Sequence, residues 1–257
     1  MPAVENGSFA WIYSHHIQIH RVTGRINSKP LLQAHSPTPV SRIVSNIVDL
    51  VFRVQGDHLP VDHAWALSQA VIAVLPWITH DEQSGIHHVH ILESGSGWQR
   101  PTSDSWMYLS KRTHFMLRIP MGRVEHSRAL CGKILKISDC YFTVGEGHIR
   151  HLSPIATLYA HHIVVPPETG NEDALLEWAK NLLRKNNIEP TQMLCGRQRH
   201  VSTPGSVLQT RSLMIAELKP EESLTLQETG LGSHRKLGCG LFLPHKSIAS
   251  TRDIIDT

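Results

Sequence analysis

The sequence has few cysteines, and none of them stand in the spacing that holds a structural metal. The four are Cys131, Cys140, Cys195 and Cys239, and no two form a CxxC motif. This spacing argues against a structural zinc site and against a disulfide framework. Free thiols are typical of a cytoplasmic protein, which is the location that we expect.

Long hydrophobic runs are absent as well. No apolar stretch approaches the roughly 18 residues that a membrane-spanning helix needs. The first residues also lack the basic-then-apolar order of a signal peptide, so we expect no membrane partner. The GK[ST] ending of a Walker A phosphate loop does not occur, which argues against an ATPase or GTPase of the P-loop class.

Neither positive nor negative charge is in large excess, but the positive charge is unevenly distributed along the chain. The 257 residues carry a formal net charge of +3, with 40% hydrophobic and 18% charged residues, as in a globular protein. Between Arg184 and Arg252 there are ten Lys or Arg and five Asp or Glu, so this span carries 10 − 5 = +5. The C-terminal quarter therefore attracts a polyanion such as nucleic acid.

Histidine is abundant, with 19 residues. Its ordinary pKa of about 6.5 suits a site that moves protons near neutral pH, although scattered surface histidines are also common. Adjacent histidines such as His161 and His162 lack a third ligand at suitable spacing. We therefore expect no metal and no other cofactor.

The pattern of strands and helices predicts an α+β protein with two tandem ferredoxin-like domains. Residues 1–46 have no sustained period and end in a Ser- and Pro-rich stretch. We expect an N-terminal extension, which is disordered, a small added element, or the product of an upstream start codon that is not the natural one. The first domain spans 47–153 and the second 154–247, followed by a tail over 248–257. Each domain has the order β-α-β-β-α-β.

In the first domain the expected elements begin with a strand in VDLVFRVQG. A helix follows with Asp62 as its cap and Pro76 at its end. The alternating segments IHHVHIL and THFMLRIP predict strands, RVEHSRALCG a short helix, and KILKISDCYFTVGEG a pair of strands.

In the second domain TLYAHHIVV predicts a strand, and NEDALLEWAKNLLRKNN predicts a helix capped by Asn171. Two strands, a helix ending at Gly230 and the strand LGCGLFLP complete the order.

A loop rich in glycine and basic residues lies between that helix and the last strand. Bare amides can surround an anion, and Arg235 and Lys236 place two cations at the rim. If the segment were only a helix cap followed by a loose hairpin, Gly230 would be the one glycine required. Because four glycines lie beside basic residues, we favour a loop that contacts phosphate. The loop residues expected to contact phosphate are Gly230, Gly232, His234, Arg235, Lys236, Gly238 and Gly240.

Two such domains with this loop near the C-terminus resemble the RAMP superfamily of CRISPR-associated proteins. Within it, the chain is similar to the repeat-cleaving endoribonucleases that mature CRISPR RNA, in the subgroup labelled MYXAN. The similar segments are LPVDHAWAL, LPWITHDEQSGIHHV, SPIATLYA and EESLTLQETGLGSHRKLGCGLFLP. The glycine loop also occurs in RAMP proteins that do not cut RNA. The DH…GIH region therefore makes the resemblance to the endoribonucleases more specific.

The resemblance implies metal-independent cleavage of CRISPR repeat RNA. The 2′-OH before the scissile phosphate attacks the phosphorus, and the products are a 2′,3′-cyclic phosphate and a 5′-OH. One group must accept the proton of the 2′-OH and another must protonate the departing oxygen, and histidine suits both roles.

The family's catalytic histidine comes from the first helix or the loop after it. Three residues match this region: His87 in SGIHH, our first choice, His80 in THDE, and His63 in the first helical turn. Each could instead be a structural or surface histidine. For RNA binding we add Arg197 and Arg199, which alternate onto one face of a strand, and Arg150.

The resemblance further implies that the product, CRISPR RNA, stays bound and passes to other subunits of a class 1, Cascade-like surveillance complex. Two alternatives stay open. The chain could be a subunit that binds this RNA without cutting it, or a histidine-rich metal-dependent hydrolase.

Overall fold

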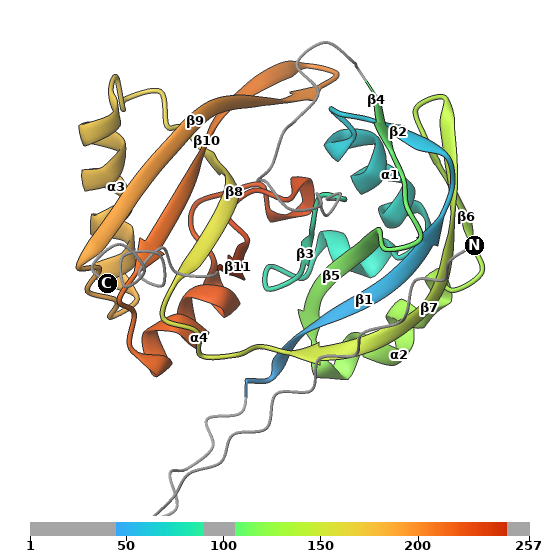
Figure 1. Ribbon diagram of the computed structural model, residues 1–257, viewed down its shortest axis with the longest axis horizontal. Helices are drawn as coiled ribbons and strands as arrows, with labels where there is room; N and C mark the ends of the chain where they lie inside the picture. The colour runs from blue at the N-terminus through green and yellow to red at the C-terminus, as the bar shows by residue number, and fades with distance from the viewer. Residues whose placement is uncertain (1–44, 90–105, 246–257) are drawn as a thin grey trace, which may run out of the picture. The chain divides into compact units, whose positions relative to one another are not determined.

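The computed structural model describes residues 45–89 and 106–245 (Figure 1). The predicted extension over 1–46 lies outside the described residues except for Ser45 and Asn46, and so does the tail predicted over 248–257. Among the helices of the described part, none is long and apolar enough to cross a membrane.

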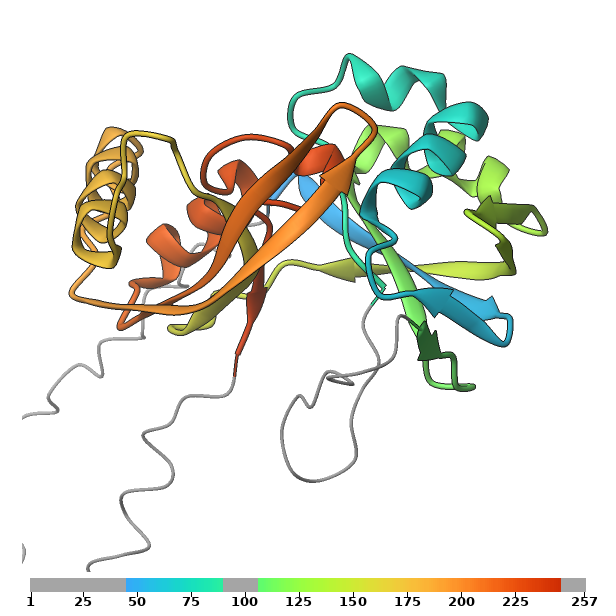
Figure 2. The ribbon, with the colours of Figure 1, turned by 90° about the horizontal axis from the view of Figure 1, so that it is seen from above.

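The first half of the described chain, here called the first unit, is built on an antiparallel five-stranded sheet. Its order is β3-β5-β1-β7-β6. Helices α1 (Ala64–Val74) and α2 (Val124–Ser127) lie on the same side of this sheet (Figure 2). The strands are β1 (Ile47–Gln55), β3 (Gly85–Ile86), β5 (His114–Pro120), β6 (Ile134–Ile137) and β7 (Cys140–His151).

Helix α1 forms because its apolar residues recur at helical spacing. Ala64, Leu67 and Val71 are buried on one face, and Pro76 opens a 3₁₀ turn, Pro76–Thr79, that ends the helix. The predicted cap is wrong by one residue, because His63 is the N-cap. The carboxylate of Asp62 instead accepts the backbone N–H of Ser202, at 3.1 Å to Oδ2, in the second half of the chain.

The second half of the described chain, the second unit, has a four-stranded antiparallel sheet in the order β11-β8-β10-β9. Its longest helix begins as predicted, because the side chain of Asn171 accepts the backbone N–H of Ala174 at 2.8 Å. The elements are β8 (Leu158–Val164), α3 (Glu172–Lys185), β9 (Gln192–Thr203), β10 (Ser206–Ala216), α4 (Pro220–Thr229) and β11 (Phe242–Pro244).

Both sheets have the ferredoxin-like order, in which the fourth strand of the unit lies beside the first, followed by the third and the second. In the first unit this order is β7-β1-β5-β3, and β6 is added at the edge. The prediction of two tandem ferredoxin-like domains is confirmed. A separate pair of strands, β2 (His58–Pro60) and β4 (Trp106–Tyr108), was not predicted.

Two predicted strands are shorter than expected. Of the strand predicted over 86–92, residues 90–92 lie outside the described residues, and in the described part the strand β3 ends at Ile86. The strand predicted in LGCGLFLP reduces to β11, because Arg235–Leu237 forms a 3₁₀ turn, and Gly238 and Gly240 have φ angles of 75° and 71°. The two shortened segments meet each other, because His88 Nε2 lies 2.8 Å from the carbonyl of Leu237.

Strand β1 is buried on both faces, which determines where the second unit packs. Val48, Leu50 and Phe52 belong to the core of the first unit, where Phe52 stacks on Phe115 at 5.8 Å between ring centroids. The alternate residues Asp49 and Val51 point to the other face and are also buried. That other face meets the second unit.

Candidate functional site

The glycine-rich segment of the second unit contacts the loop that follows α1 in the first. The guanidinium of Arg235 donates to the backbone carbonyl of Gln83 at 2.7 Å, and the ammonium of Lys236 donates to the carbonyls of Asp81 and Ser84. We call these contacts of Arg235 and Lys236 with loop 81–84 the clasp. It holds the segment after His80 against the glycine-rich segment.

The two cations of the clasp are partly exposed, and they donate to carbonyls of the protein itself. Arg235 also donates to the carbonyls of Thr229 and Glu228, at 2.6 and 2.9 Å. Burial lowers the pKa of Arg235 to about 10 and that of Lys236 to about 8. The sequence suggested a basic rim open to phosphate, whereas these donors bind the protein's own carbonyls.

The glycines of the segment are required by close packing. Gly238 has a φ angle of 75°, and a Cβ on it would collide with the ring of His88. Gly230 ends α4 with a φ angle of 67°, where a Cβ would collide with Arg235 Nη1 and the carbonyl of Gly240. Gly230, Gly238 and Gly240 are buried, and Gly232 is exposed. The bare backbone therefore permits the approach of the two units.

The tip of the segment is open to solvent. Ser233 and His234 are exposed, and the Ser233 hydroxyl lies 2.7 Å from His234 Nδ1. His234 has a left-handed φ angle of 66° and precedes the two clasp residues directly. Between Gly230 and Gly240, this tip and Gly232 are the fully exposed part of the segment.

His87, the first choice from the sequence, is buried on the interior face of the first sheet. Its side chain is 3% exposed, and its Nε2 lies 3.6 Å from Asp49 Oδ1. Its backbone N–H donates to the carbonyl of Met116 at 3.0 Å. Burial, with the charges of Arg118 and Arg150 acting in the same direction against the opposing effect of Asp49, lowers the pKa of His87 to about 4. The ring is therefore neutral at physiological pH and shielded from solvent.

His63 is buried in a structural position at the start of α1. Its Nδ1 lies 2.9 Å from the carbonyl of Pro60, and its Nε2 accepts the backbone N–H of Val89 at 3.0 Å. Since Nε2 is the acceptor, Nδ1 carries the hydrogen that is donated to Pro60. Both ring nitrogens join loops around the first helix.

His80 is the exposed member of the three predicted histidines. It ends the 3₁₀ turn after α1, where its backbone N–H donates to the carbonyl of Trp77 at 3.2 Å. The next residue, Asp81, is held by Lys236 of the clasp. The structure thus places an accessible imidazole of the first unit next to a loop fixed by the second.

A buried ion pair near His87 was not predicted from the sequence. Arg118 is fully buried and binds Asp49, with Nε to Oδ1 at 2.9 Å and Nη2 to Oδ2 at 3.1 Å. Its Nη1 donates to the carbonyls of Gln227 and Phe242 in the second unit, at 2.9 and 2.7 Å. Burial would raise the pKa of Asp49, but the charge of Arg118 and the neighbouring His87 hold it well below its usual range. The sequence signal for this pair is that the apolar strands VDLVF and FMLRIP each contain one charged residue, Asp49 and Arg118.

His88 also joins the two units. Its Nε2 lies 2.8 Å from the carbonyl of Leu237, and its ring stacks on that of His162 at 4.4 Å between centroids. His162 in turn lies 2.9 Å from the Thr210 hydroxyl through Nδ1. Burial lowers the pKa of His88 well below its ordinary value, so this imidazole is neutral and structural.

The three predicted arginines lie on different elements. Arg197 is exposed and Arg199 is partly exposed on β9, the edge strand of the second sheet. Arg199 also affects an imidazole on β8 of the same sheet: burial, together with the charge of Arg199, lowers the pKa of His161 to about 3. Arg150 on β7 donates to Asp49 Oδ2 at 2.7 Å, and its side chain is 46% exposed.

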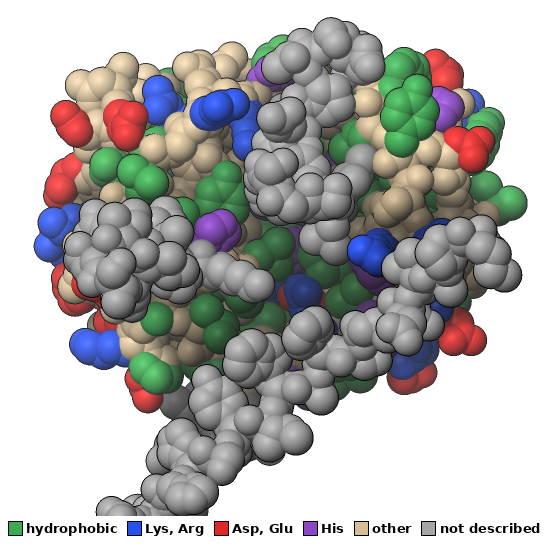
Figure 3. All heavy atoms as spheres, viewed as in Figure 1, with side chains coloured by type: hydrophobic (Ala, Val, Ile, Leu, Met, Phe, Trp, Pro, Cys, Tyr) green, Lys and Arg blue, Asp and Glu red, His purple; other side chains and the backbone are tan. Residues whose placement is uncertain are grey.

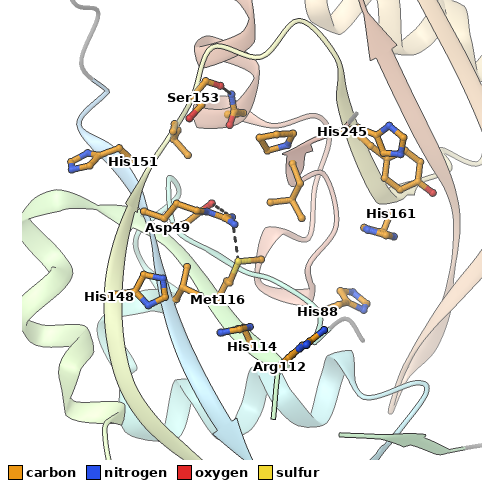
Figure 4. Close-up of a pocket in the computed structure, with 17 residues that line it drawn as sticks. Asp49, His88, Arg112, His114, Met116, His148, His151, Ser153, His161 and His245 are labelled. Carbon is orange, nitrogen blue, oxygen red and sulfur yellow. Dashed lines mark hydrogen bonds and ion pairs between the residues drawn. The ribbon is translucent and has the colours of Figure 1, made fainter. Parts of the chain in front are cut away.

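Arg150, Asp49 and His161 line a cavity of about 450 Å³ between the two sheets (Figure 4). In the space-filling view, hydrophobic and histidine side chains lie in a hollow at the centre of the face of the molecule shown there (Figure 3). Within residues 45–89 and 106–245, no three His, Cys, Asp or Glu side chains come together in a way that could hold a metal ion.

A family model described as "Cas6 Crispr" matches residues 48–247 of this chain. A curated protein of Myxococcus xanthus (strain DK1622), named "CRISPR-associated endonuclease Cas6", is 30% identical over 197 residues, which are 77% of this chain and 81% of that protein.

Solved structures have the same fold at low sequence identity. One titled "CRISPR associated protein Cas6" aligns with a TM-score of 0.57 and 12% identity, over 78% of this chain and all of that one. One titled "Characterization of a Cas6-related gene from Pyrococcus furiosus" aligns with a TM-score of 0.57 and 12% identity, over 77% of this chain and 98% of that one. One titled "An RAMP protein binding different RNA substrates" aligns with a TM-score of 0.54 and 12% identity, over 77% and 100%.

Proposed function

This chain belongs to the Cas6 family of CRISPR-associated proteins, and we propose that it is an endoribonuclease that cuts CRISPR repeat RNA in the precursor transcript. The first domain, residues 47–153, supplies the proton-transferring group, and the second, residues 154–247, supplies most of the RNA contacts. The observation that carries the proposal is the position of exposed His80, next to a loop that the clasp holds against the glycine-rich segment.

The reaction needs two proton transfers and no redox step. The 2′ oxygen forms a bond to phosphorus as a base takes its proton, and the bond from phosphorus to the 5′ oxygen breaks as an acid protonates that oxygen. His80 performs one of these transfers, because it is accessible whereas His63 and His87 are buried. We assign the other transfer to His234, which is exposed in the glycine-rich segment. The products are a 2′,3′-cyclic phosphate and a 5′-OH.

RNA affinity comes from cations that are open to solvent. Arg197 and Arg199 lie on one edge strand, and Arg150 lies at the cavity, so phosphates can reach all three guanidiniums. The exposed loop tip at Gly232 and His234 adds contacts near the reacting phosphate. Arg235 and Lys236 act as positioning residues, since their donors bind the carbonyls of loop 81–84.

After cutting, the CRISPR RNA stays bound and passes to other subunits of a class 1, Cascade-like surveillance complex. The cytoplasm, where the precursor transcript is made, is the place of action. The protein recognises such an RNA through its shape, its phosphates and its unpaired bases, because side chains cannot read the deep major groove of an RNA helix.

A second candidate function is an RNA-binding subunit without turnover. The observation that favours it is the burial of His63 and His87, two of the three histidines that the sequence offered. One experiment separates the two functions. The purified chain is mixed in EDTA with labelled CRISPR repeat RNA. A shorter product with a 2′,3′-cyclic phosphate supports the nuclease, whereas tight binding of intact RNA supports the subunit.

A further inference from the structure

The second unit contacts the segment around helix α1 on both sides of that helix. Beyond its end, the clasp holds loop 81–84, which follows His80. At its start, the carboxylate of Asp62 accepts the backbone N–H of Ser202 on β9, at 3.1 Å to Oδ2 and 3.3 Å to Oδ1. Two perpendicular views show the tip of the β9–β10 hairpin beside the start of α1 (Figure 1, Figure 2). Both contacts connect the second unit to the segment that carries His80.

Strand β9 lies at the edge of its sheet, so half of its backbone groups face no neighbouring strand. In the described part of the chain it pairs with β10 alone. The N–H of Ser202 points away from β10, and the carboxylate of Asp62 occupies the place of a missing strand. A hydrogen bond to an ionised carboxylate is stronger than one between neutral groups. Asp62 therefore attaches the edge of β9 to the first unit.

Apolar packing supports this attachment. Val201, directly before Ser202, is 1% exposed and belongs to a small buried cluster with Ala64 of α1 and with Leu237 and Cys239. Two consecutive residues of β9 are thus attached at the start of α1, one through its side chain and one through its backbone. The end of β9 has a defined position relative to the first unit.

The two arginines of β9 that we propose to bind phosphate lie close to this attachment along the strand. Arg199 comes three residues before Ser202, and Arg197 comes five residues before it. Because a strand rises about 3.3 Å per residue, both Cα atoms lie within roughly 17 Å of the Ser202 Cα. A shift of this end of β9 would move both guanidiniums relative to His80.

The charge of Asp62 makes a positioning role testable, because the charge alone acts in the opposite direction. An anion beside a strand that binds RNA repels phosphate. The side chain of Asp62 is 30% exposed, and His200 Nε2, 4.0 Å from Oδ2, is charged only when protonated. If charge alone matters, removing Asp62 strengthens RNA binding. If Asp62 positions β9, removing it weakens RNA binding.

We propose that Asp62 is a positioning residue for RNA binding, which holds β9 with Arg197 and Arg199 at a fixed place relative to the segment that carries His80. It contacts neither the phosphates nor the reacting atoms and acts through the backbone of Ser202. This inference rests on the proposed function. It gives a reason for an anion beside the strand that binds RNA.

Two substitutions of Asp62 separate its charge from its hydrogen bond. Asp62→Ala and Asp62→Asn both remove the charge, but only Asn retains an oxygen that can accept the N–H of Ser202. In filter binding with repeat RNA, Asp62→Ala should bind roughly 2- to 12-fold more weakly than the wild type, which is the factor that one hydrogen bond usually contributes. Asp62→Asn should bind at least as tightly as the wild type.

Either of two results overturns the proposal in this experiment. Asp62→Ala that binds RNA as tightly as the wild type would show that the attachment does not position the arginines. Asp62→Asn that loses as much affinity as Asp62→Ala would show that the charge, and not the hydrogen bond, is what matters.

Double variants test whether the effect acts through the arginines of β9. When Arg197 and Arg199 are both replaced with Ala, adding Asp62→Ala should change RNA affinity less than about twofold, because no guanidinium remains to be positioned. When Arg150 is replaced with Ala, adding Asp62→Ala should have its full effect, because Arg150 lies on β7 of the first unit. Equal effects in both backgrounds would indicate a general loss of stability and contradict the proposal.

A last measurement does not depend on RNA. In hydrogen exchange followed by NMR, the amide of Ser202 should exchange faster in Asp62→Ala than in the wild type or Asp62→Asn. The amide of Ala174, which donates to Asn171, is the control and should exchange equally in all three. If the wild type binds no repeat RNA, the proposed function fails and the role in RNA binding fails with it, while this measurement still decides whether Asp62 holds β9. Unchanged exchange at Ser202 in Asp62→Ala overturns the positioning role even where RNA binding falls.

Discussion

Arg118 Nε lies 2.9 Å from Asp49 Oδ1, and both side chains are buried on the face of the first sheet that meets the second unit. The same guanidinium donates to the carbonyls of Gln227 and Phe242 across that interface. Desolvated charges are stable only when their partners are in place. This pair therefore links the stability of the first sheet to the position of the second.

Replacing Arg118 with Met should be severely destabilising. Asp49 would lose its bidentate partner, and two carbonyls of the second unit would lose their donor, so we expect a loss of about 3–5 kcal/mol in the free energy of unfolding. The measurement is urea unfolding followed by circular dichroism. Arg184→Met is the matched control, because the pair of Arg184 with Glu189 is exposed and should cost at most about 1 kcal/mol. Equal losses for the two variants would contradict a buried link at Arg118.

Acid should destabilise the protein between about pH 6.5 and pH 4. Burial lowers the pKa of His87 to about 4 in the folded state, whereas the unfolded chain has the ordinary value near 6.5. In this window the unfolded state binds more protons, so the free energy of unfolding falls as the pH falls. The lowered pKa values of His88 and His161 act in the same direction.

The check is a series of urea titrations at several pH values. His87→Gln should flatten the pH dependence, and His126→Gln should leave it unchanged, because His126 is exposed on α2. A pH dependence that His87→Gln does not alter would show that this imidazole titrates equally in both states.

The salt dependence of RNA binding should distinguish the arginines of β9 from the clasp. Arg197 and Arg199 can reach phosphates, so replacing both with Ala should reduce the slope of log affinity against log salt by roughly 0.7–0.9 for each phosphate that is no longer bound. Arg235→Ala and Lys236→Ala should leave this slope unchanged but slow cleavage, because loop 81–84 loses its donors. Filter binding at four salt concentrations measures the slope. If the slope falls for the clasp variants instead, those cations contact RNA.

Gly238→Ala should disturb the interface between the units more than an equally strained substitution elsewhere. Gly132 has the same φ angle of 75°, but a Cβ on it would meet nothing within 4 Å, whereas one on Gly238 would collide with His88. Both variants carry left-handed strain of about 1–2 kcal/mol, so the difference between them isolates the collision. Thermal unfolding should show a larger loss for Gly238→Ala. Equal losses would mean that His88 moves aside freely.

The repeated fold could be predicted from the sequence because it depends on local patterns. Alternation in TLYAHHIVV and the apolar stripe of residues 64–75 determine a strand and a helix whatever lies around them. The cap at Asn171 is local as well. The lengths of the short strands at the interface were overestimated, because the carbonyl of Leu237 pairs with His88 of the other unit.

The environment of the site could not be predicted, because it depends on contacts distant in sequence. Arg235 meets the carbonyl of Gln83 across 152 positions, and Arg118 meets that of Phe242 across 124. A basic residue beside glycines has the same local pattern whether it faces RNA or a carbonyl. His80 is exposed whereas His87 is buried against Asp49, a contact with a residue that is distant in the sequence.

Single-turnover cleavage of labelled repeat RNA in EDTA by the His80→Ala variant tests the central claim most directly. We expect the rate to fall roughly 10²- to 10⁴-fold with RNA affinity nearly unchanged, while the exposed control His126→Ala cuts at the wild-type rate. His80→Ala that cuts as fast as the wild type, to the same cyclic phosphate product, would contradict the assignment of proton transfer to His80.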